Sequence, residues 1–517
     1  MENRTIRGGA EILLLLAAAG CGSSGHNQAQ APVSTPAPLQ GDTWVGYGHD
    51  AQHTGLSAAQ SQPLQTIRWQ TPVDLQPQVS PSLLTHYGSP AVTEQNTVIV
   101  PVKTGPTDGF RIEARSGASG ALLWTLDTDY SVPTAGFTPP FGPALTQGGV
   151  AIPAAGGTVM LRGNADQAQG SATRVAFYGI DNFNGNAAGF TNTVKINTPI
   201  SADSQGNLFF GFIVTGSNPL NLQSGVARIG HDGQGTWISA ASASADPAIT
   251  KVSMSCAPAL SKDESHLYVS VNNVDSGFGY LLELDATTLQ PLNRVRLIDP
   301  QSGADAMISD SSTAAPTVGP DGDVFYGVLE NPFPGHHDRG WLLHFNADLT
   351  QQKIPGGFGW DDTASIVPAS MVPSYHGASQ YLLMTKYNNY IEAGGDGVNK
   401  LAILDPGAGS PDSILGNPVM QEVLTIAGQT RDTRAGLPPT AVREWCINTA
   451  AVDPFTKSIV ANSEDGRLYR WDLTTNQFSQ VITITGGIGE AYTPTVIGDD
   501  GTVYAINRAV LFGVGAP

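Results

Sequence analysis

The stretch that decides the fold is Ala314-Ala315-Pro316-Thr317-Val318-Gly319-Pro320-Asp321-Gly322-Asp323-Val324-Phe325-Tyr326. It places small residues and a proline before a Gly/Asp turn, and a run of Val, Phe and Tyr after it. Gly, Pro and Asp are typical of tight turns, whereas β-branched and aromatic residues favour strands. The stretch therefore predicts a short strand that begins at a proline, a tight turn, and a second strand.

Seven further copies of this pattern occur along the chain. Each has small residues around a proline, replaced by alanine in one copy, followed by a turn and an apolar run. The copies stand 44 to 77 residues apart. That is the scale of a four-stranded propeller blade with extended loops, because compact blades run to about 40–50 residues. With Pro316, the repeat positions are Pro90, Pro143, Pro199, Pro258, Pro373, Ala450 and Pro494.

The repeat predicts an all-β fold, an eight-bladed β-propeller of four-stranded antiparallel blades. Proline cannot donate a hydrogen bond to a strand ladder, so a proline at the same place in most repeats marks a strand with a free edge or a crowded start. The innermost strand of a blade is such a strand. A two-sheet β-sandwich with several hairpins is the alternative, and eight copies in one chain favour the propeller.

The last repeat is too short to form a whole blade. After Pro494 the 23 remaining residues suffice for three strands, and Thr66–Val73 forms an isolated predicted strand before the first repeat. We expect this N-terminal strand to pair with a terminal strand at Ala509–Gly513. Such pairing would remove two open edges and close the ring.

The N-terminus has the features of an export signal. Arg4 and Arg7 precede the apolar run Ile12–Ala19, which ends in small residues. The stretch Leu16-Ala17-Ala18-Ala19-Gly20-Cys21 resembles a bacterial lipoprotein signal, which implies lipidation of Cys21; a cleaved signal with an incidental cysteine is the alternative. We expect a signal peptide over residues 1–21, a flexible linker over 22–41 and a propeller domain over 42–517. The expected location is the periplasm, or the outer membrane or cell surface through a lipid anchor alone.

The opening of the predicted domain carries a family resemblance. Residues 44–57 (WVGYGHDAQHTGLS), a following strand with Trp69, and Gly120-Ala121-Leu122-Leu123-Trp124 resemble proteins with pyrroloquinoline-quinone-like (PQQ-like) repeats. Over about residues 42–517 the resemblance implies an eight-bladed propeller, and it does not by itself imply the cofactor. We expect His49 and His53 of this opening to hydrogen-bond around the closure of the ring.

The same resemblance bears on cofactors. Quinone-dependent members of the family carry two adjacent cysteines in a disulfide, calcium ligands and an aspartate base. This chain has no Cys-Cys pair, and Cys256 and Cys446 fall in the fourth and seventh repeats. PQQ with calcium is therefore disfavoured, and the sequence predicts no other cofactor.

Loop lengths predict which face of the ring is used. In a four-stranded blade, the turn between the first two strands lies on one face, and the second-to-third loop and the crossover to the next blade lie on the other. First turns are short throughout, and the longest crossover, about Pro406–Trp445, emerges with the long loops. Such one-sided elaboration is typical of binding surfaces. The long second loops are expected at Lys103–Phe110, Ala154–Thr173, Thr215–Gly225, Asn272–Gly279, Leu329–Gly340 and Asn388–Asn399.

Three groups of candidate site residues lie on that face. His336, His337 and Asp338 could bind a transition metal, or form a solvated loop. Asn388–Gly397 could donate oxygens to calcium, although it lacks the EF-hand pattern and a Gly-rich turn is the alternative. Residues just before the inner strands should line the channel mouth, where they would bind a small polar ligand or a sugar, or simply border water. These are His86, Tyr87, Phe141, Asn197, Glu444, Trp445, Glu490 and Tyr492.

The charge balance and the motifs leave three functional hypotheses. With 25 Lys+Arg against 44 Asp+Glu, the net charge of -19 argues against a nucleic-acid partner. No nucleophile-elbow, zinc-protease or P-loop motif occurs. The leading hypothesis is a non-enzymatic binding scaffold that contacts a protein or polymer across the loop-rich face. The alternatives are a periplasmic PQQ-dependent oxidoreductase and a metal-dependent hydrolase.

Overall fold

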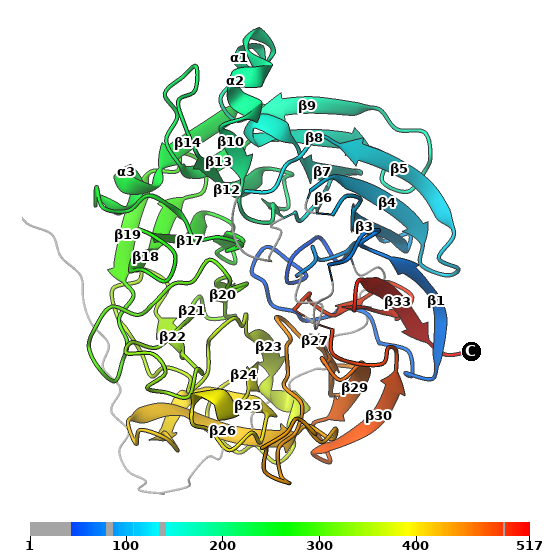
Figure 1. Ribbon diagram of the computed structural model, residues 1–517, viewed down its shortest axis with the longest axis vertical. Helices are drawn as coiled ribbons and strands as arrows, with labels where there is room; N and C mark the ends of the chain where they lie inside the picture. The colour runs from blue at the N-terminus through cyan, green and yellow to red at the C-terminus, as the bar shows by residue number, and fades with distance from the viewer. Residues whose placement is uncertain (1–42, 79–85, 107, 134–140, 490–491) are drawn as a thin grey trace, which may run out of the picture. The chain divides into compact units, whose positions relative to one another are not determined.

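Eight small antiparallel sheets are arranged radially around a common centre, as Figure 1 shows. The computed structural model describes residues 43–78, 86–106, 108–133, 141–489 and 492–517. The predicted all-β, eight-bladed propeller is confirmed. Among these residues, no helix has the length and apolar character needed to cross a membrane.

The first four blades follow one another from the inner strand outward. Blade 1 contains β2 (Ala91–Val92), β3 (Thr97–Lys103), β4 (Phe110–Ser116) and β5 (Leu122–Thr128). Blade 2 contains β6 (Ala144–Thr146), β7 (Gly149–Pro153), the 3-10 turn η1 (Ala155–Gly157), β8 (Thr158–Gly163) and β9 (Ala172–Ala176). Blade 3 contains β10 (Val194–Ile196), β11 (Ser201–Ala202), β12 (Leu208–Val214), β13 (Gly225–Ile229) and β14 (Gly235–Ser239). Blade 4 contains β15 (Lys251–Val252), β16 (Ala259–Leu260), β17 (His266–Asn272), β18 (Gly279–Asp285) and β19 (Pro291–Arg296).

The other four blades complete the ring. Blade 5 contains β20 (Thr317–Val318), β21 (Val324–Val328) and β22 (Trp341–Phe345). Blade 6 contains β23 (Ser365–Pro368), β24 (Tyr381–Tyr387), β25 (Lys400–Pro411) and β26 (Pro418–Ala427). Blade 7 contains β27 (Ala451–Asp453), β28 (Ser458–Asn462), β29 (Arg467–Asp472) and β30 (Gln477–Thr483). Blade 8 contains β31 (Val496–Ile497), β32 (Val503–Asn507), β33 (Val510–Gly515) and β1 (Thr66–Pro72). The short helices are α1 (Ile180–Gly185), α2 (Ala187–Thr191), α3 (Ala240–Ser244), η2 (Ala369–Met371) and η3 (Ile391–Ala393).

Proline shapes the inner strands as predicted. In blade 3 the inner strand is split into β10 and β11, which both pair with β12, and Pro199 lies in the break. The hydroxyl of Thr198 accepts the Gly211 N–H at 2.9 Å within this interruption. A strand that loses ladder partners at a proline is thereby kept hydrogen bonded by a neighbouring side chain.

The sequence prediction for blade 6 was wrong. Its inner strand is β23, and Pro373 lies beyond it in the connection to β24. That connection spans residues 369–380, so the first turn of blade 6 is long. Blade 5 also departs from four regular strands: its fourth is an irregular segment with bridges from Phe345 to Gln352 and from Leu342 to Gly356.

Two of the predicted loops contain strands. The predicted loop Ala154–Thr173 includes β8, so the second loop of blade 2 is only residues 154–157. The predicted crossover Pro406–Trp445 includes the end of β25 and all of β26, which leaves residues 428–450 to cross to blade 7. We call the loop-rich face the one that carries residues 215–224, 273–278, 329–340, 388–399 and the crossovers. The short-turn face is the opposite one.

The predicted ring closure is confirmed. β1 pairs antiparallel with β33, from Thr66 opposite Gly515 to Pro72 opposite Val510, with a bulge between Ile67 and Trp69. The two ends of the chain thus share blade 8, and the closing strands lie together at the right of Figure 1.

Trp69 fixes this closure against the next blade. Its indole Nε1 donates to the Gly117 carbonyl at 2.7 Å. A Cβ added at Gly120 or at Gly513 would lie 2.7 or 2.8 Å from the indole ring, so only glycine lets the ring lie flat there. Trp124 on β5 contacts blade 2 in the same way, donating to the Ala165 carbonyl at 2.8 Å. The Gly and Trp residues quoted from the sequence therefore hold neighbouring blades together.

Candidate functional site

The N-terminal segment Trp44–Ser57 runs along the inner strands at the centre of the ring. It is the dark blue chain inside the blades in Figure 1. Backbone hydrogen bonds join it to six blades. They are Trp44 N to Val92 O (2.9 Å), Leu145 N to Val45 O (2.7 Å), Leu260 N to Ala51 O (2.7 Å), Val318 N to Gln52 O (2.9 Å), Ile366 N to Thr54 O (2.8 Å) and Val452 N to Gly55 O (2.8 Å). We call residues 44–57 the central segment.

These hydrogen bonds pair backbone groups on the free edges of the inner strands. An inner strand has one neighbour in its own blade, and its other edge faces the centre. The bonded residues Val92, Leu145 and Val318 each belong to an inner strand and lie next to its turn on the short-turn face. The central segment therefore occupies the centre of the ring on the short-turn side.

Tyr47 carries the central segment's side-chain contacts to blades 5 to 7. Its hydroxyl oxygen lies 2.7 Å from the Thr313 carbonyl oxygen and 2.8 Å from Thr363 Oγ1. The Asn448 side-chain oxygen lies 2.7 Å from the same hydroxyl. The ring packs with Ala257 and Ala315. Burial raises the pKa of Tyr47, so the phenol stays protonated.

The expectation that the opening histidines lie around the ring closure was wrong for His53. His53 is buried, and its Nδ1 lies 2.8 Å from the Pro316 carbonyl oxygen in blade 5, away from the closure between blades 8 and 1. Burial lowers the pKa of His53 to about 4. His49 lies beside Asp50, with Nδ1 to Oδ2 at 3.2 Å. Both residues position the central segment.

Buried charges lie at the centre of the ring on the loop-rich side. Lys386, at the end of β24, is fully buried, and its Nζ lies 3.8 Å from Asp361 Oδ2. Asp361 also accepts the Thr313 N–H and hydroxyl, both at 2.6 Å. Burial raises the pKa of the neighbouring Asp362 well above its usual value. A buried lysine beside the Asp361 carboxylate makes this position strongly polar.

Some of the predicted channel-mouth residues lie near Lys386. The rings of His86 and Tyr492 are 3.9 Å apart, and the Lys386 ammonium lies 4.9 Å from the Tyr492 ring centre. Burial, with Lys386 adding to it, lowers the pKa of His86 well below its usual value. These three residues form one cluster.

The other predicted mouth residues are spread out. Tyr87 donates to Asp74 at 2.9 Å, and Phe141 stacks on Phe110 in the core. Asn197 donates to the Val252 carbonyl at 2.9 Å. Glu490 lies outside the described residues. Glu444 and Trp445 lie at the entry to blade 7, where Asn388 accepts the Trp445 N–H at 3.1 Å.

The three predicted metal ligands do not converge. Both ring nitrogens of the buried His336 are engaged, Nδ1 at 3.0 Å from the Gly340 carbonyl oxygen and Nε2 at 3.2 Å from Asp412 Oδ1. His337 Nδ1 lies 2.9 Å from Asn389 Oδ1. Burial, and then repulsion from Glu330, raise the pKa of Asp338 to about 7.

The oxygen-rich loop at Asn388–Gly397 uses its polar groups internally. Asp396 Oδ1 accepts from Asn389 Nδ2 at 2.7 Å and from the Val398 N–H at 2.8 Å. Gly394, with φ of 99°, ends the 3-10 turn η3. The geometry matches the Gly-rich turn that the sequence left as the alternative to a calcium loop.

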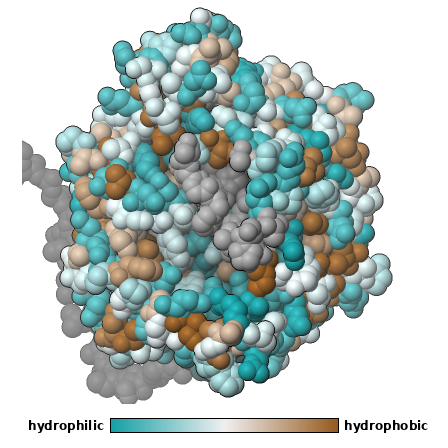
Figure 2. All heavy atoms as spheres, viewed as in Figure 1, coloured by the Kyte–Doolittle hydropathy of each residue, from teal (hydrophilic) through white to brown (hydrophobic). Residues whose placement is uncertain are grey.

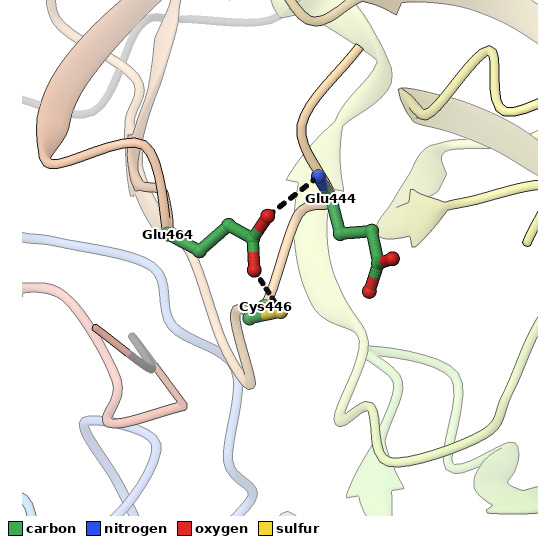
Figure 3. A group of neighbouring side chains, drawn as sticks. All are labelled: Glu444, Cys446 and Glu464. Atoms are coloured by element: carbon green, nitrogen blue, oxygen red, sulfur yellow. Dashed lines mark hydrogen bonds between the residues drawn. The ribbon is translucent and has the colours of Figure 1, made fainter. Parts of the chain in front are cut away.

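A different group of side chains has metal-ligand spacing. Ligand atoms of Glu444, Cys446 and Glu464 all lie within 4.8 Å of one another, and Figure 3 shows Glu464 reaching across to the other two. Glu464 accepts the Cys446 thiol at 3.4 Å and the Glu444 N–H at 3.2 Å. Burial and the nearby Glu464 raise the pKa of Glu444 to about 7. Sequence reasoning singled out Glu444 but not Glu464, which comes from the β28–β29 loop.

The two cysteines of the described residues lie on separate blades. Cys256 and Cys446, on blades 4 and 7, are not joined in a disulfide. Burial raises the pKa of Cys256 to about 12. The group with metal-ligand spacing includes a thiol, whereas calcium takes oxygen ligands.

Exposed apolar side chains concentrate on the loop-rich side and on the outer rim. Figure 2 shows hydrophobic residues scattered among hydrophilic ones on the face that it draws. Of the large apolar side chains with high exposure among the described residues, Leu75, Leu220, Val274 and Phe333 lie in loops of the loop-rich face, and Leu122, Leu292 and Val481 lie on outer strands. Leu220, Val274 and Phe333 belong to the consecutive blades 3, 4 and 5. Val274 and Phe333 are 56% and 52% exposed.

Comparison with known proteins finds similarity in fold and none in sequence family. No family model and no curated protein matches it. Among solved structures, a europium-containing methanol dehydrogenase matches with a TM-score of 0.53 and 10% identity, over 90% of this chain and 89% of that chain. Saccharomyces cerevisiae Sqt1 matches with a TM-score of 0.50 and 12% identity, over 88% and 100%. BamB from Moraxella catarrhalis matches with a TM-score of 0.40 and 11% identity, over 83% and 97%. At such identities the likeness to the methanol dehydrogenase and to Sqt1 shows a shared fold alone, the β-propeller, which serves many functions.

Proposed function

We propose that the protein is an exported, lipid-anchored scaffold that binds a protein partner through its loop-rich face. The observation that carries the proposal is the path of the central segment. Thr43 enters the ring on the short-turn face, where it lines a cavity of about 560 Å³ with Glu94 and Gln147 of the first turns of blades 1 and 2. The central segment then fills the centre of the ring on that side. The long loops and the buried charges lie on the opposite, loop-rich side.

The length of chain before Thr43 sets the reach of the proposed anchor. Residues 22–42 separate the proposed lipidated Cys21 from Thr43. Fully extended, 21 residues reach about 70 Å, and as a flexible coil they span about 25 Å on average. An anchor attached there joins the ring on the short-turn face and leaves the loop-rich face open to a partner.

The exposed apolar side chains supply the contacts. Phe333, Val274 and Leu220 project from second loops of three neighbouring blades. A few residues carry most of the binding energy of protein interfaces, with aromatic side chains prominent among them, and rigid rings with long loops position such residues well. We expect a folded protein partner rather than another polymer, because three exposed apolar side chains on adjacent blades suit contact with the surface of a folded protein.

Photo-cross-linking in cells tests the proposal. With a photoreactive residue at position 220, 274 or 333, we expect discrete adducts, because these side chains contact the partner. Control positions on outer strands, 122, 292 and 481, also carry large, exposed apolar side chains, and we expect no adduct from them. Replacing Phe333 with serine should weaken partner binding by at least about tenfold, since interface aromatics often contribute 2 kcal/mol or more.

Other outcomes would overturn the proposal. Equal adducts from the outer-strand positions would contradict a loop-rich binding face. Absence of a lipid on Cys21 of the mature protein, checked by mass spectrometry, would contradict the lipid anchor. A stoichiometric quinone absorption band with dye reduction, after addition of pyrroloquinoline quinone and calcium, would favour an oxidoreductase.

A further inference from the structure

We propose that Glu444, Cys446 and Glu464 form a binding site for a zinc-type divalent cation, at the entry to blade 7 on the loop-rich face. The proposal is independent of the scaffold function. It assigns a metal site to residues that belong neither to the central segment nor to the Lys386 cluster.

Two chain segments bring the ligands together. Glu444 and Cys446 stand two residues apart in the crossover that leads to β27, so their side chains can project to the same side of an extended chain. Glu464 comes from the loop between β28 and β29 and faces them, as Figure 3 shows. The ligands are thus fixed by a crossover and a hairpin of the same blade.

The spacing is close to that of a bound ion. Zinc lies about 2.3 Å from a thiolate and about 2.0–2.2 Å from a carboxylate oxygen, so ligand atoms around a tetrahedral ion are about 3.3–3.8 Å apart. Here all three ligand atoms lie within 4.8 Å of one another, and the Cys446 Sγ is already 3.4 Å from Glu464 Oε2. Small side-chain rotations of the two glutamates would close the remaining gap.

The donor set selects the class of metal. A thiolate with two carboxylates suits zinc and related transition ions, whereas calcium and magnesium prefer oxygen ligands alone. The Cys446 residue is only 3% exposed, which shields its thiol from bulk solvent. Three protein ligands leave the fourth position of a tetrahedral ion for water or for a group of a bound partner.

A cation can displace the arginine that is paired with Glu444. Arg434 Nη2 lies 3.3 Å from Glu444 Oε1. The same guanidinium also pairs with Asp432 at 2.7 Å and with Glu392 at 3.0 Å. Arg434 is nearly half exposed, so it can leave Glu444 and keep its other partners when a cation binds. Metal and arginine therefore compete for the Glu444 carboxylate.

Titration of the purified full-length protein with Co²⁺ tests the site. We expect one ion per chain, a thiolate-to-cobalt charge-transfer band, and displacement of the cobalt by Zn²⁺. Cys446→Ser should remove the charge-transfer band. Glu464→Gln should keep the thiol but weaken binding by at least about tenfold, because it removes a charged ligand. Arg434→Gln should tighten binding, which a purely structural hydrogen-bond cluster would not predict.

The second buried cysteine provides the matched control. The Cys256 thiol is hydrogen bonded with Ser270 and Tyr326 instead, and Cys256→Ser should leave the cobalt spectrum unchanged. Circular dichroism of each variant shows whether it is folded, and Glu464→Gln tests the site even if a cysteine variant does not fold. Absence of the charge-transfer band in the unaltered protein, its persistence in Cys446→Ser, or its loss in Cys256→Ser would overturn the proposal.

Discussion

Replacing Tyr47 with alanine is expected to lower the free energy of unfolding by about 3–5 kcal/mol, as for other buried aromatic residues. The loss has two parts. The ring leaves a cavity against Ala257 and Ala315. The Thr313 carbonyl, Thr363 hydroxyl and Asn448 amide also lose a shared partner at the centre of the ring. Equilibrium denaturation followed by tryptophan fluorescence measures the change.

Tyr47→Phe separates these contributions. It keeps the ring and removes only the hydroxyl, so we expect a loss of about 1–3 kcal/mol, the cost of leaving buried polar groups without a partner. If both substitutions changed the stability by less than about 0.5 kcal/mol, the level typical of surface sites, Tyr47 would not join three blades.

The second large effect concerns ring closure. Trp69→Ala should lower the free energy of unfolding by about 3–5 kcal/mol, because a buried indole on the closing strand is removed. The substitution also abolishes the hydrogen bond to the Gly117 carbonyl and empties the space against Gly513. Denaturation curves provide the stability, and limited proteolysis shows whether β1 detaches.

Trp237 is the matched control for Trp69. It also lies on an outermost strand, β14 of blade 3, but it is partly exposed and does not close the ring. We expect Trp237→Ala to cost clearly less and to leave β1 resistant to protease. Equal decreases in the free energy of unfolding for the two variants would mean that the strand closing blade 8 contributes no more to stability than another outermost strand.

The sequence predicts the architecture well because the fold is repetitive. The recurring proline, the Gly/Asp turn and the following β run identify most inner hairpins, and the count of residues after Pro494 predicts the closing strand at Thr66–Val73. Blade 6 is the exception. Its inner strand lacks the preceding proline, and Pro373 in the next connection imitates the pattern.

The centre of the ring could not be predicted in the same way. Tyr47 and Asn448 are 401 residues apart, and no local pattern relates them. The group of Glu444, Cys446 and Glu464 could not be predicted for the same reason. Glu464 comes from a separate loop, and an isolated glutamate belongs to no recognisable sequence motif. His336 and His337 are adjacent in sequence, yet their rings contact Asp412 and Asn389, in separate parts of blade 6.

Amide hydrogen exchange of residues 44–57 tests most directly whether the N-terminal segment closes the short-turn side of the ring. The Trp44 and Ser57 N–H groups donate to Val92 and Val452 at 2.9 Å, and Gly55 N–H donates to Gly48 at 2.9 Å. We predict that peptides covering this segment exchange as slowly as those from the inner strands. Exchange at the rate of an unstructured peptide, in a protein whose blades remain protected, would contradict the account.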